Sequence, residues 1–376
     1  MCCAAPRGGW PCLGRPGAAV VVTFQRDPLA GKIPVTLITG FLGSGKTTLI
    51  SKLVRHADMA RVAVVINEVG EIGIDHDLVT MATENITLLA NGCICCSVRT
   101  DLQETLRELF SQRHMGQVLD FDRVVIETTG LADPAPVVQT LVSDTLLGAQ
   151  FRLDGVITLV DAVHGLGQLD SQPESVKQIA LADRIFLTKC DLSNAANINT
   201  LREAIAAINP VAEVRPVLNG EVQPAELMDL GLASARASAA TLSFLGESLA
   251  DSNPVRAAQG RYLGQRTSRH DPAIATLSLR FDAPFTWSSF SAAMELLVTL
   301  RGPDLLRVKG IVNIEGQPVV VQAVQHIFHP PVSLDHWPSE DTGSRLVFIT
   351  RNIDGAVIRQ LLQAVGAVAS PAGGAP

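Results

Sequence analysis

Gly40-Phe41-Leu42-Gly43-Ser44-Gly45-Lys46-Thr47 follows the apolar run Pro34-Val35-Thr36-Leu37-Ile38-Thr39 and fits G-x-x-x-x-G-K-[ST], the pattern of a phosphate-binding loop. Glycines at these spacings let consecutive backbone N–H groups turn inward and surround phosphate oxygens. Lys46 reaches the outer phosphates, and the Thr47 hydroxyl is a ligand for Mg²⁺. The helix that begins at Thr47 directs its positive end toward the same charge.

The surroundings of this loop favour a nucleotide site over a glycine-rich turn that binds nothing. A β-rich apolar run precedes it, and apolar residues at helical spacing (Leu49, Leu53 and Val54) follow it. The chain is therefore expected to bind a nucleoside triphosphate. The residues expected to contact the phosphates or Mg²⁺ are Gly40, Gly43, Ser44, Gly45, Lys46, Thr47 and Thr48, with Lys46 in a catalytic role.

Length and charge narrow the classes of protein to consider. The 376 residues suffice for two domains. With 30 basic and 37 acidic side chains the net charge is −7, and no long basic run is present, so nucleic acid is not expected as a partner. Apolar stretches fall short of the ~18 residues of a membrane span, so we expect no membrane partner and a cytoplasmic location.

Between Ile33 and about Leu218, apolar β-branched runs alternate with helical patterns. This alternation predicts an α/β domain over residues 33–218, a mostly parallel sheet with helices on both faces that binds ligands at the carboxyl ends of its strands. The expected strands are Val62–Ile66, Ile86–Leu89, Arg123–Ile126, Val156–Val160, Ile185–Thr188 and Val214–Leu218. The expected helices are Leu102–Phe110, Ala135–Leu141, Val176–Ala182 and Leu201–Ile208.

The rest of the chain divides into four parts. Residues 1–32 are rich in Gly, Pro and Ala, and we expect a disordered leader or a mis-called translation start. Patterning fades over residues 219–272, which we expect to be a linker with some helix. Residues 273–368 predict a smaller α+β domain, and residues 369–376 a frayed tail. The elements expected in this second domain are strands at Thr276–Phe281, Leu306–Ile314, Val319–His326 and Arg345–Thr350, a helical pattern from Trp287 to Leu297 and a helix at Ala356–Val365.

A carboxylate follows the strand Arg123–Ile126. Glu127 is succeeded by Thr128-Thr129-Gly130, and a strand-end carboxylate opposite a phosphate loop is where Mg²⁺ or its water shell is held. Gly130 lets its N–H approach a γ-phosphate. The apolar strand and the glycine favour a catalytic, magnesium-binding Glu127 over an exposed strand-end glutamate. Because Leu131 stands where a water-orienting glutamine would be expected, basal hydrolysis is expected to be slow, roughly 10⁻⁴–10⁻² s⁻¹.

The expected strand Ile185–Thr188 leads into Thr188-Lys189-Cys190-Asp191, which approximates the guanine-binding signature N-K-x-D. The Asp191 carboxylate accepts both N1–H and N2–H of guanine, and the Lys189 stem lies along the base. Thr188 replaces the usual asparagine and offers only a hydroxyl. Adenine lacks this pair of donors, so GTP is favoured over ATP, with Thr188, Lys189 and Asp191 as base-binding residues.

Three of the seven cysteines lie in Gly92-Cys93-Ile94-Cys95-Cys96. Such clustering in a cytosolic chain favours metal or redox chemistry over a disulfide framework. Cys93, Cys95 and Cys96 could bind one soft or borderline cation: Zn²⁺, Co²⁺ or Cu⁺. Three sulfurs leave a tetrahedral site one ligand short, and carboxylates are available in Asn67-Glu68-Val69-Gly70-Glu71. Inert buried cysteines or a redox pair are the alternatives.

These motifs together resemble the CobW family of P-loop GTPases, especially its YjiA-like branch. The match runs from about Ile33 to Ile358 and includes, in the family's order, Gly40–Thr47, Asn67–Glu71, Gly92–Cys96, Glu127–Pro134 and Thr188–Asp191, followed by Leu306–Gly310 and Gln325–His329. The resemblance implies GTP hydrolysis coupled to delivery of zinc or cobalt to a client metalloprotein. It also implies that Glu68 binds the metal with the cysteines.

One departure from that family is the histidine content of the linker. Many relatives carry a His-rich run in or after it, whereas this chain has only His270 there. His326 and His329 are three apart on an extended segment, and we expect them to face opposite sides in structural roles rather than to bind a metal together.

Three functions remain to be weighed. A GTP-driven metal chaperone comes first, a metal-sensing regulatory GTPase without transfer second, and a kinase or ligase last because the motifs supply no acceptor site. A homodimer that depends on nucleotide or metal is left open.

Overall fold

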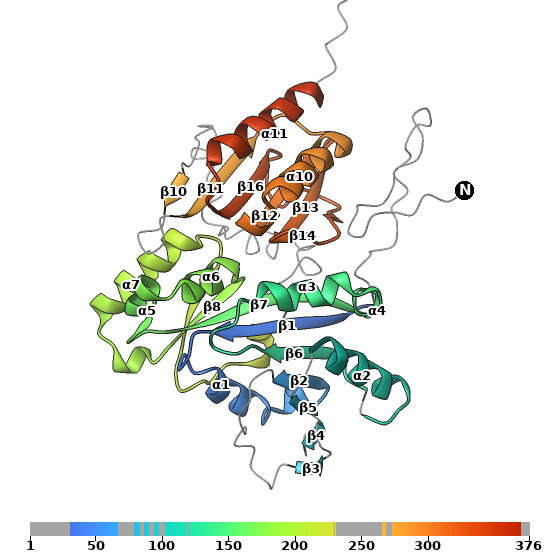
Figure 1. Ribbon diagram of the computed structural model, residues 1–376, viewed down its shortest axis with the longest axis vertical. Coiled ribbons are helices and arrows are strands. Elements are labelled where there is room, and N and C mark those ends of the chain that lie inside the picture. Colours follow the sequence, from blue (N-terminus) through green and yellow to red (C-terminus); the bar gives the residue numbers. More distant parts are fainter. Residues whose placement is uncertain are drawn as a thin grey trace, which may run out of the picture.

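The computed structural model describes residues 31–66, 79–82, 86–89, 94–97, 102–118, 120–228, 230, 265–267 and 273–369. These residues form two β-sheets, and the C-terminal sheet lies over one face of the N-terminal one (Figure 1). No helix among these ranges is long and apolar enough to cross a membrane.

The N-terminal sheet has nine strands in the order β3-β4-β5-β2-β6-β1-β7-β8-β9. From β5 to β9 neighbouring strands run parallel, whereas β3 and β4 form an antiparallel edge. The predicted mostly parallel sheet is therefore confirmed. The strands are β1 Ile33–Gly40, β2 Val62–Ile66, β3 Val79–Ala82, β4 Ile86–Leu89, β5 Ile94–Ser97, β6 Arg123–Glu127, β7 Phe151–Asp161, β8 Arg184–Thr188 and β9 Glu213–Val217.

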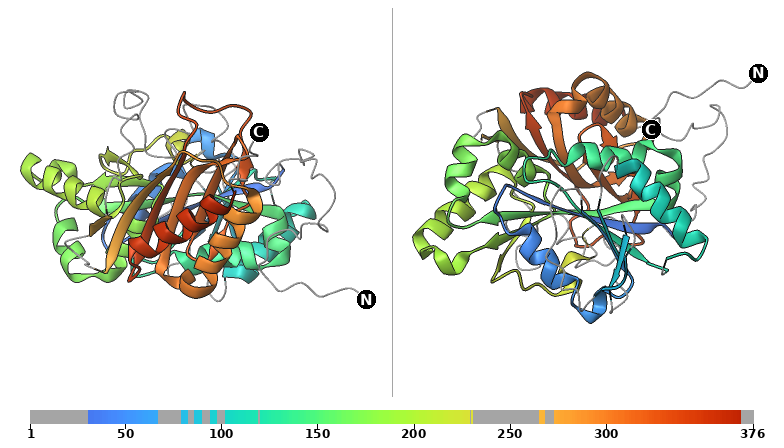
Figure 2. Two further views of the ribbon diagram at one scale, coloured as in Figure 1. Left: turned by 90° about the horizontal axis from the view of Figure 1, so that it is seen from above. Right: turned by 60° about the horizontal axis from the view of Figure 1, so that its bottom comes forward.

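Helices cover both faces of this sheet because its strands are apolar on both sides. Ile38, Val64 and Phe186 pack on one face against α1, and the opposite face packs against the other helices (Figure 2, right). The helices are α1 Lys46–Leu53, α2 Leu102–His114, α3 Ala135–Ser143, α4 Thr145–Gln150, α5 Gly165–Ser171, α6 Pro173–Leu181 and α7 Ala195–Ile208.

The C-terminal domain is an antiparallel sheet with two helices on its outer face. Its strand order is β10-β11-β16-β12-β13-β14, and β15 pairs with β13. Phe290, Met294 and Leu297 of α10 are buried against this sheet, as their helical spacing predicted. The elements are β10 Gln265–Thr267, β11 Ile274–Phe281, α10 Trp287–Arg301, β12 Leu305–Ile314, β13 Gln317–Val324, β14 Ile327–Phe328, β15 Val332–Ser333, β16 Ser344–Arg351 and α11 Gly355–Ala369.

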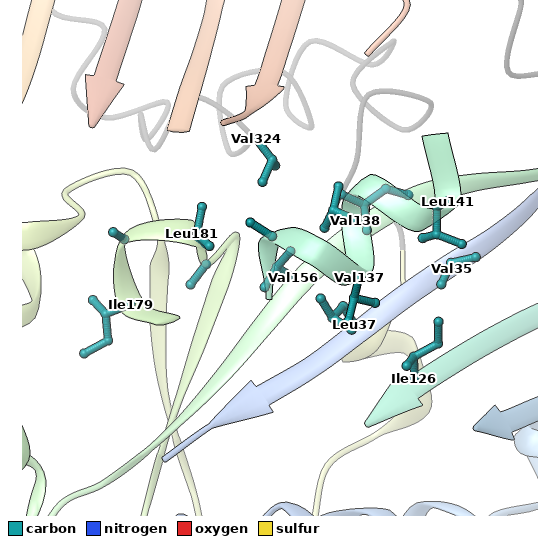
Figure 3. Packing of buried hydrophobic residues seen from close by; sticks show 14 of the residues in the cluster. Val35, Leu37, Ile126, Val137, Val138, Leu141, Val156, Ile179, Leu181 and Val324 are labelled. Atoms are coloured by element: carbon teal, nitrogen blue, oxygen red, sulfur yellow. The ribbon is translucent and has the colours of Figure 1, made fainter. Parts of the chain in front are cut away.

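The two domains share one continuous apolar core. Leu306, Val324 and Ile349 of the C-terminal sheet belong to the same buried cluster as the helices of the N-terminal domain. Figure 3 shows Val324 between the C-terminal strands and the region of Val138 and Val156. A buried ion pair between Arg307 and Asp183 joins the domains at the same interface.

The ends of the expected linker pack onto the two domains. Val222 and Leu227 are buried in the core beside α1, and Leu227 ends the short 3₁₀ helix Pro224–Leu227. At the other end β10 pairs with β11, so residues 265–267 are part of the C-terminal sheet. Regular patterning fades at both ends of the expected linker. At its start the chain forms only the short 3₁₀ helix Pro224–Leu227, and at its end β10 has only three residues.

Candidate functional site

The phosphate-binding loop connects β1 to α1 in a conformation that requires its glycines. Gly40, Gly43 and Gly45 have φ angles of 146°, 74° and 95°. At Gly40 a Cβ would also lie 2.4 Å from the Leu159 carbonyl oxygen, because the loop leaves the sheet directly against β7. The left-handed Gly45 precedes the first helical residue, Lys46, so the amides of the first turn of α1 face the loop.

Two polar side chains of this loop are buried. Lys46 is 5% exposed, and its Nζ donates to the carbonyl oxygens of Gly40 at 2.9 Å and Phe41 at 3.3 Å. Ser44 is fully buried, and its Oγ has no hydrogen-bond partner among the residues described. An inward-facing ammonium and a buried hydroxyl that can still donate fit phosphate oxygens, which are strong acceptors.

Thr47 and Thr48 lie exposed in the first turn of α1, and Glu127 ends the strand next to β1. The Glu127 carboxylate is 1% exposed. Its neighbour Thr128 hydrogen-bonds Thr39, at the end of β1, through a 2.8 Å contact between hydroxyls. The predicted magnesium residues Thr47 and Glu127 therefore belong to elements that meet at one edge of the sheet. Hydroxyl and carboxylate oxygens are the ligands that Mg²⁺ accepts.

Gly130 lies directly against the phosphate-binding loop. A Cβ at this position would be 2.8 Å from the Leu42 backbone nitrogen and 2.9 Å from its Cα, so only glycine fits without moving one of the two loops. The predicted approach of Gly130 to the phosphate region therefore has a steric basis.

The Thr188–Asp191 segment contacts the phosphate loop from the other side. Thr188 Oγ1 donates to the Ser44 carbonyl oxygen at 2.8 Å, so the hydroxyl fastens β8 to the loop. Lys189 has φ 57°, and its Nζ donates to the Gly43 carbonyl oxygen at 2.8 Å. Asp191 follows in an exposed 3₁₀ turn, where its carboxylate is accessible to a base.

Asp161 completes this part of the site, at the end of β7. Its Oδ2 lies 2.7 Å from Lys189 Nζ, and its Oδ1 accepts from the backbone N–H of Val163 at 2.7 Å. Burial by itself would raise the pKa of Asp161, but the hydrogen bonds from Lys189, Val163 and His164 hold that pKa below its ordinary value. Asp161 is therefore a carboxylate at neutral pH and holds the Lys189 side chain in place.

The predicted metal residues are only partly described. Glu68 and Cys93 lie outside the described residues, as does His270. The backbone of Cys95 and Cys96 lies in β5, paired with Val64 and Val65 of β2. Within the described ranges, no group of three or more Cys, His, Asp or Glu side chains could hold a metal ion. The metal site therefore stays a prediction.

His326 and His329 do not converge. His326 is exposed beside the turn that follows β13, whereas His329 is 7% exposed and lies inside the C-terminal domain. The predicted extended segment is wrong at His326, which lies in the turn between β13 and β14, and the two side chains differ in burial rather than alternating along one strand.

Two further residues near the carboxyl ends of the central strands were not predicted from the sequence. Asp161 follows the apolar run Val156–Val160 as Glu127 follows Arg123–Ile126, so the same strand-end signal was available. Gln178 of α6 is buried and hydrogen-bonds the carbonyl oxygens of Gly130 and Ala132. Its sequence neighbourhood is an ordinary amphipathic helix, so no local signal distinguishes it.

Two sequence families match the chain in the order of its domains. Residues 34–216 match the CobW/HypB/UreG nucleotide-binding domain, and residues 274–366 match the cobalamin synthesis protein cobW C-terminal domain. The two matches cover the two sheets and leave the intervening segment between them.

Individual proteins resemble nearly the whole chain. The zinc chaperone YjiA of Escherichia coli is 37% identical over 320 residues, which are 84% of this chain and 93% of that protein. The zinc chaperone CobW of Pseudomonas aeruginosa is 31% identical over 374 residues, covering 88% of this chain and 91% of that protein. The crystal structure of Zn(II)-bound YjiA GTPase from E. coli superposes with a TM-score of 0.68 at 31% identity, over 89% of this chain and 99% of that one.

Proposed function

This chain belongs to the CobW family of P-loop GTPases, and on that premise we propose that it is a metal chaperone that hydrolyses GTP to load and release zinc or cobalt for a client metalloprotein. Similar proteins named as zinc chaperones support the metal, and the loop geometry supports the nucleotide.

The observation that carries this proposal is the register of three neighbouring strands. Ser97 of β5 pairs with Ile66 of β2, and Ile66 pairs with Glu127 of β6. Strands in a sheet are about 4.8 Å apart, so the end of the cysteine strand lies about 10 Å from the backbone of Glu127. Glu68 follows the end of β2, the strand between them. A structural change at the nucleotide would therefore pass through only one strand, β2, to reach the proposed metal ligands.

For the nucleotide we propose the following roles. Lys46 leaves the Gly40 and Phe41 carbonyls to bind the outer phosphates, together with the N–H groups of the loop and the Ser44 hydroxyl. Thr47 and Glu127 hold Mg²⁺, which when bound neutralises charge on the phosphate oxygens. Asp191 accepts two hydrogen bonds from guanine, while Thr188 and Lys189 keep that segment fastened to the loop.

In hydrolysis a water oxygen attacks the γ-phosphorus and the bond to the β–γ bridging oxygen breaks, giving GDP and inorganic phosphate. The Gly130 N–H and Lys46 stabilise the charge on the transferring group, which is the main catalytic need in phosphoryl transfer. After the γ-phosphate leaves, Gly130 loses its acceptor and the Glu127–Asp133 loop can move.

For the metal, which is cargo, we propose thiolate binding by Cys93, Cys95 and Cys96, with Glu68 as the fourth ligand. Thiolates suit zinc and cobalt, and a carboxylate on a separate segment makes the site easy to open. GTP would order both segments and hydrolysis would loosen them. Because coupling is reciprocal, the metal should also tighten GTP.

The test is a titration of Zn²⁺ and Co²⁺ against a competing chelator, with GDP or a non-hydrolysable GTP analogue present. We expect metal affinity to differ about 5- to 150-fold between the two nucleotides, the usual range of coupling between sites. Cys95→Ser with Cys96→Ser should remove most of that affinity and spare metal-free GTP binding. Cys190→Ser, which alters a cysteine outside the motif, is the matched control. Equal metal affinity in both nucleotide states would contradict the chaperone mechanism.

A further inference from the structure

Two neighbouring residues of α6 hold the loop that follows β6. Gln178 Nε2 donates to the carbonyl oxygens of Gly130 at 3.1 Å and Ala132 at 3.0 Å, and Lys177 Nζ lies 3.1 Å from Asp133 Oδ2. Both acceptors of Gln178 are carbonyl oxygens, so the amide must present its NH₂ group to them. The side chain is 1% exposed, and loss of a buried donor leaves its acceptors unsatisfied.

Just beyond the C-terminal end of α6, the chain is fastened to the C-terminal sheet. Asp183, just beyond the helix, accepts a hydrogen bond from Arg307 and lies 2.6 Å from Lys309 Nζ, both on β12. All three side chains are 1–2% exposed. Burial by itself would raise the pKa of Asp183, but the charges of Arg307 and Lys309 hold that pKa below its ordinary value. The carboxylate is therefore charged at neutral pH.

Between Gln178 and Asp183 the chain is held by further hydrogen bonds. Thr158 Oγ1 donates to the Gln178 carbonyl oxygen at 2.8 Å. Asn209 Nδ2 donates to the carbonyl oxygens of Ile179 at 2.8 Å and Ala182 at 2.9 Å, at the end of the helix. From Gln178 to the end of α6 at Leu181 the chain advances only about 4.5 Å at helical rise, and Asp183 lies two residues further on. A displacement at Gln178 therefore reaches Asp183 rather than being absorbed by slack chain.

We propose that Gln178 is a positioning residue for GTP hydrolysis and that α6 couples the Glu127–Asp133 loop to the C-terminal domain. The inference rests on the proposed function, which assigns Gly130 to the γ-phosphate. The Gly130 N–H and C=O lie on either side of one α-carbon, so a hydrogen bond to the γ-phosphate on one side and the hydrogen bond from Gln178 on the other would fix the position of the same residue. Gln178 thus acts by positioning the loop and not by orienting the attacking water. The residue after Gly130 is Leu131, which stands where a water-orienting glutamine would be expected.

The first test compares Gln178→Met with Gln168→Met in GTP hydrolysis. Methionine keeps the length and volume of glutamine but donates no hydrogen bond. Gln168 lies on the neighbouring α5, half-buried, with no side-chain hydrogen bond among the described residues. We expect Gln178→Met to lower kcat about tenfold with KM close to wild type, while the two unsatisfied carbonyl oxygens also lower the thermal midpoint. A merely structural glutamine would lower the midpoint and leave kcat unchanged.

The second test measures amide hydrogen exchange in the same full-length proteins, with GDP and with a non-hydrolysable GTP analogue. In the wild type and in Gln168→Met, exchange in β12 (Leu305–Ile314) should differ about fivefold or more between the two nucleotides. In Gln178→Met that difference should vanish, while the Glu127–Asp133 loop still responds.

The outcomes distinguish failure of this inference from failure of the proposed function. If the wild type hydrolyses GTP and Gln178→Met has the same kcat, or β12 responds equally in both, the inference is wrong and the proposed function stands. If the wild type neither hydrolyses GTP nor shows exchange differences in the Glu127–Asp133 loop, the proposed function is wrong, and this inference with it.

Discussion

The Lys189 ammonium lies 2.7 Å from the Asp161 carboxylate, and the pair joins the ends of two adjacent parallel strands, β8 and β7. Asp161 is almost fully buried, whereas a third of the Lys189 side chain is exposed. The same ammonium donates to the Gly43 carbonyl oxygen, so one lysine connects the Thr188–Asp191 segment, the β7 strand end and the phosphate-binding loop.

Asp161→Asn should weaken both GTP and GDP about tenfold. Asparagine keeps the shape but loses the charge that holds Lys189, and a charged hydrogen bond contributes about 1.5–3 kcal/mol. Titration of a fluorescent guanine nucleotide measures the effect. Asp170→Asn, which removes an equal charge from the surface of α5, should bind nucleotide like the wild type. Unchanged affinity in Asp161→Asn would mean that Lys189 needs no partner.

Asp191→Asn should weaken GTP selectively. The amide can accept only one of the two guanine hydrogen bonds and places a donor opposite the other, whereas ATP binding does not use this carboxylate. We expect the ratio of GTP to ATP affinity to fall about 30-fold or more, because one charged hydrogen bond of about 1.5–3 kcal/mol is lost. Competition of GTP and ATP for one labelled nucleotide gives the ratio directly. Equal GTP and ATP affinities in the wild type would refute guanine selectivity.

Gly130→Ala should slow hydrolysis strongly. The new Cβ would lie 2.8 Å from the Leu42 backbone nitrogen, so one of the two loops must move away. A misplaced group in an active site costs about 100-fold in rate, and we expect kcat to fall by that order. The control is Gly167→Ala on α5, where nothing lies within 4 Å of the added methyl group. Wild-type turnover in Gly130→Ala would show that this glycine does not approach the phosphates.

Stability should fall on mild acidification because of His329. Burial lowers the pKa of His329 to about 4, and the nearby Arg307 acts in the same direction while Asp183 opposes it. Between pH 6.5 and 4 the unfolded chain binds a proton that the folded chain does not, so stability is lost as the pH falls through this window. From pH 7 to pH 5 the loss amounts to about 2 kcal/mol.

His329→Gln should remove that part of the pH dependence, and His326→Gln, at the exposed position, should retain it. Urea unfolding at pH 7 and pH 5 can be followed by tryptophan fluorescence, since Trp287 and Trp337 both lie in the C-terminal domain. If His329→Gln and the wild type lose the same stability, His329 is not the group that titrates.

Most of the fold could be predicted because its signals are local. The strands at Val62–Ile66 and Ile86–Leu89 match β2 and β4 in full, and β8 begins one residue before the prediction. The remaining boundaries moved for physical reasons. The predicted helix Leu201–Ile208 covers only the apolar half of α7, which begins at Ala195 after the Asn194 cap. In β7, Asp154 and Gly155 interrupt the apolar run and concealed the first half of the strand.

The contacts between distant segments could not be predicted. The cysteines at positions 95 and 96 were predicted only as metal ligands. Their segment Ile94–Ser97 also forms the short strand β5, which pairs with β2. Arg307 and Lys309 stood in an apolar run, which signals buried charges that need a partner, but Asp183 lies more than a hundred residues away. The Thr188 hydroxyl was recognised as a departure from asparagine, and only the fold shows that it hydrogen-bonds the Ser44 carbonyl oxygen.

The position of β5 beside β2 has a consequence for how the metal preference of this family can change. All three motif cysteines and Glu68 fall within one continuous segment, between the end of β2 at Ile66 and the start of α2 at Leu102. The phosphate loop, Glu127, Gly130 and Thr188–Asp191 all lie outside it. Under the proposed function this segment carries every metal ligand and none of the nucleotide residues, so replacing it should change metal preference while the residues that bind and hydrolyse the nucleotide stay the same.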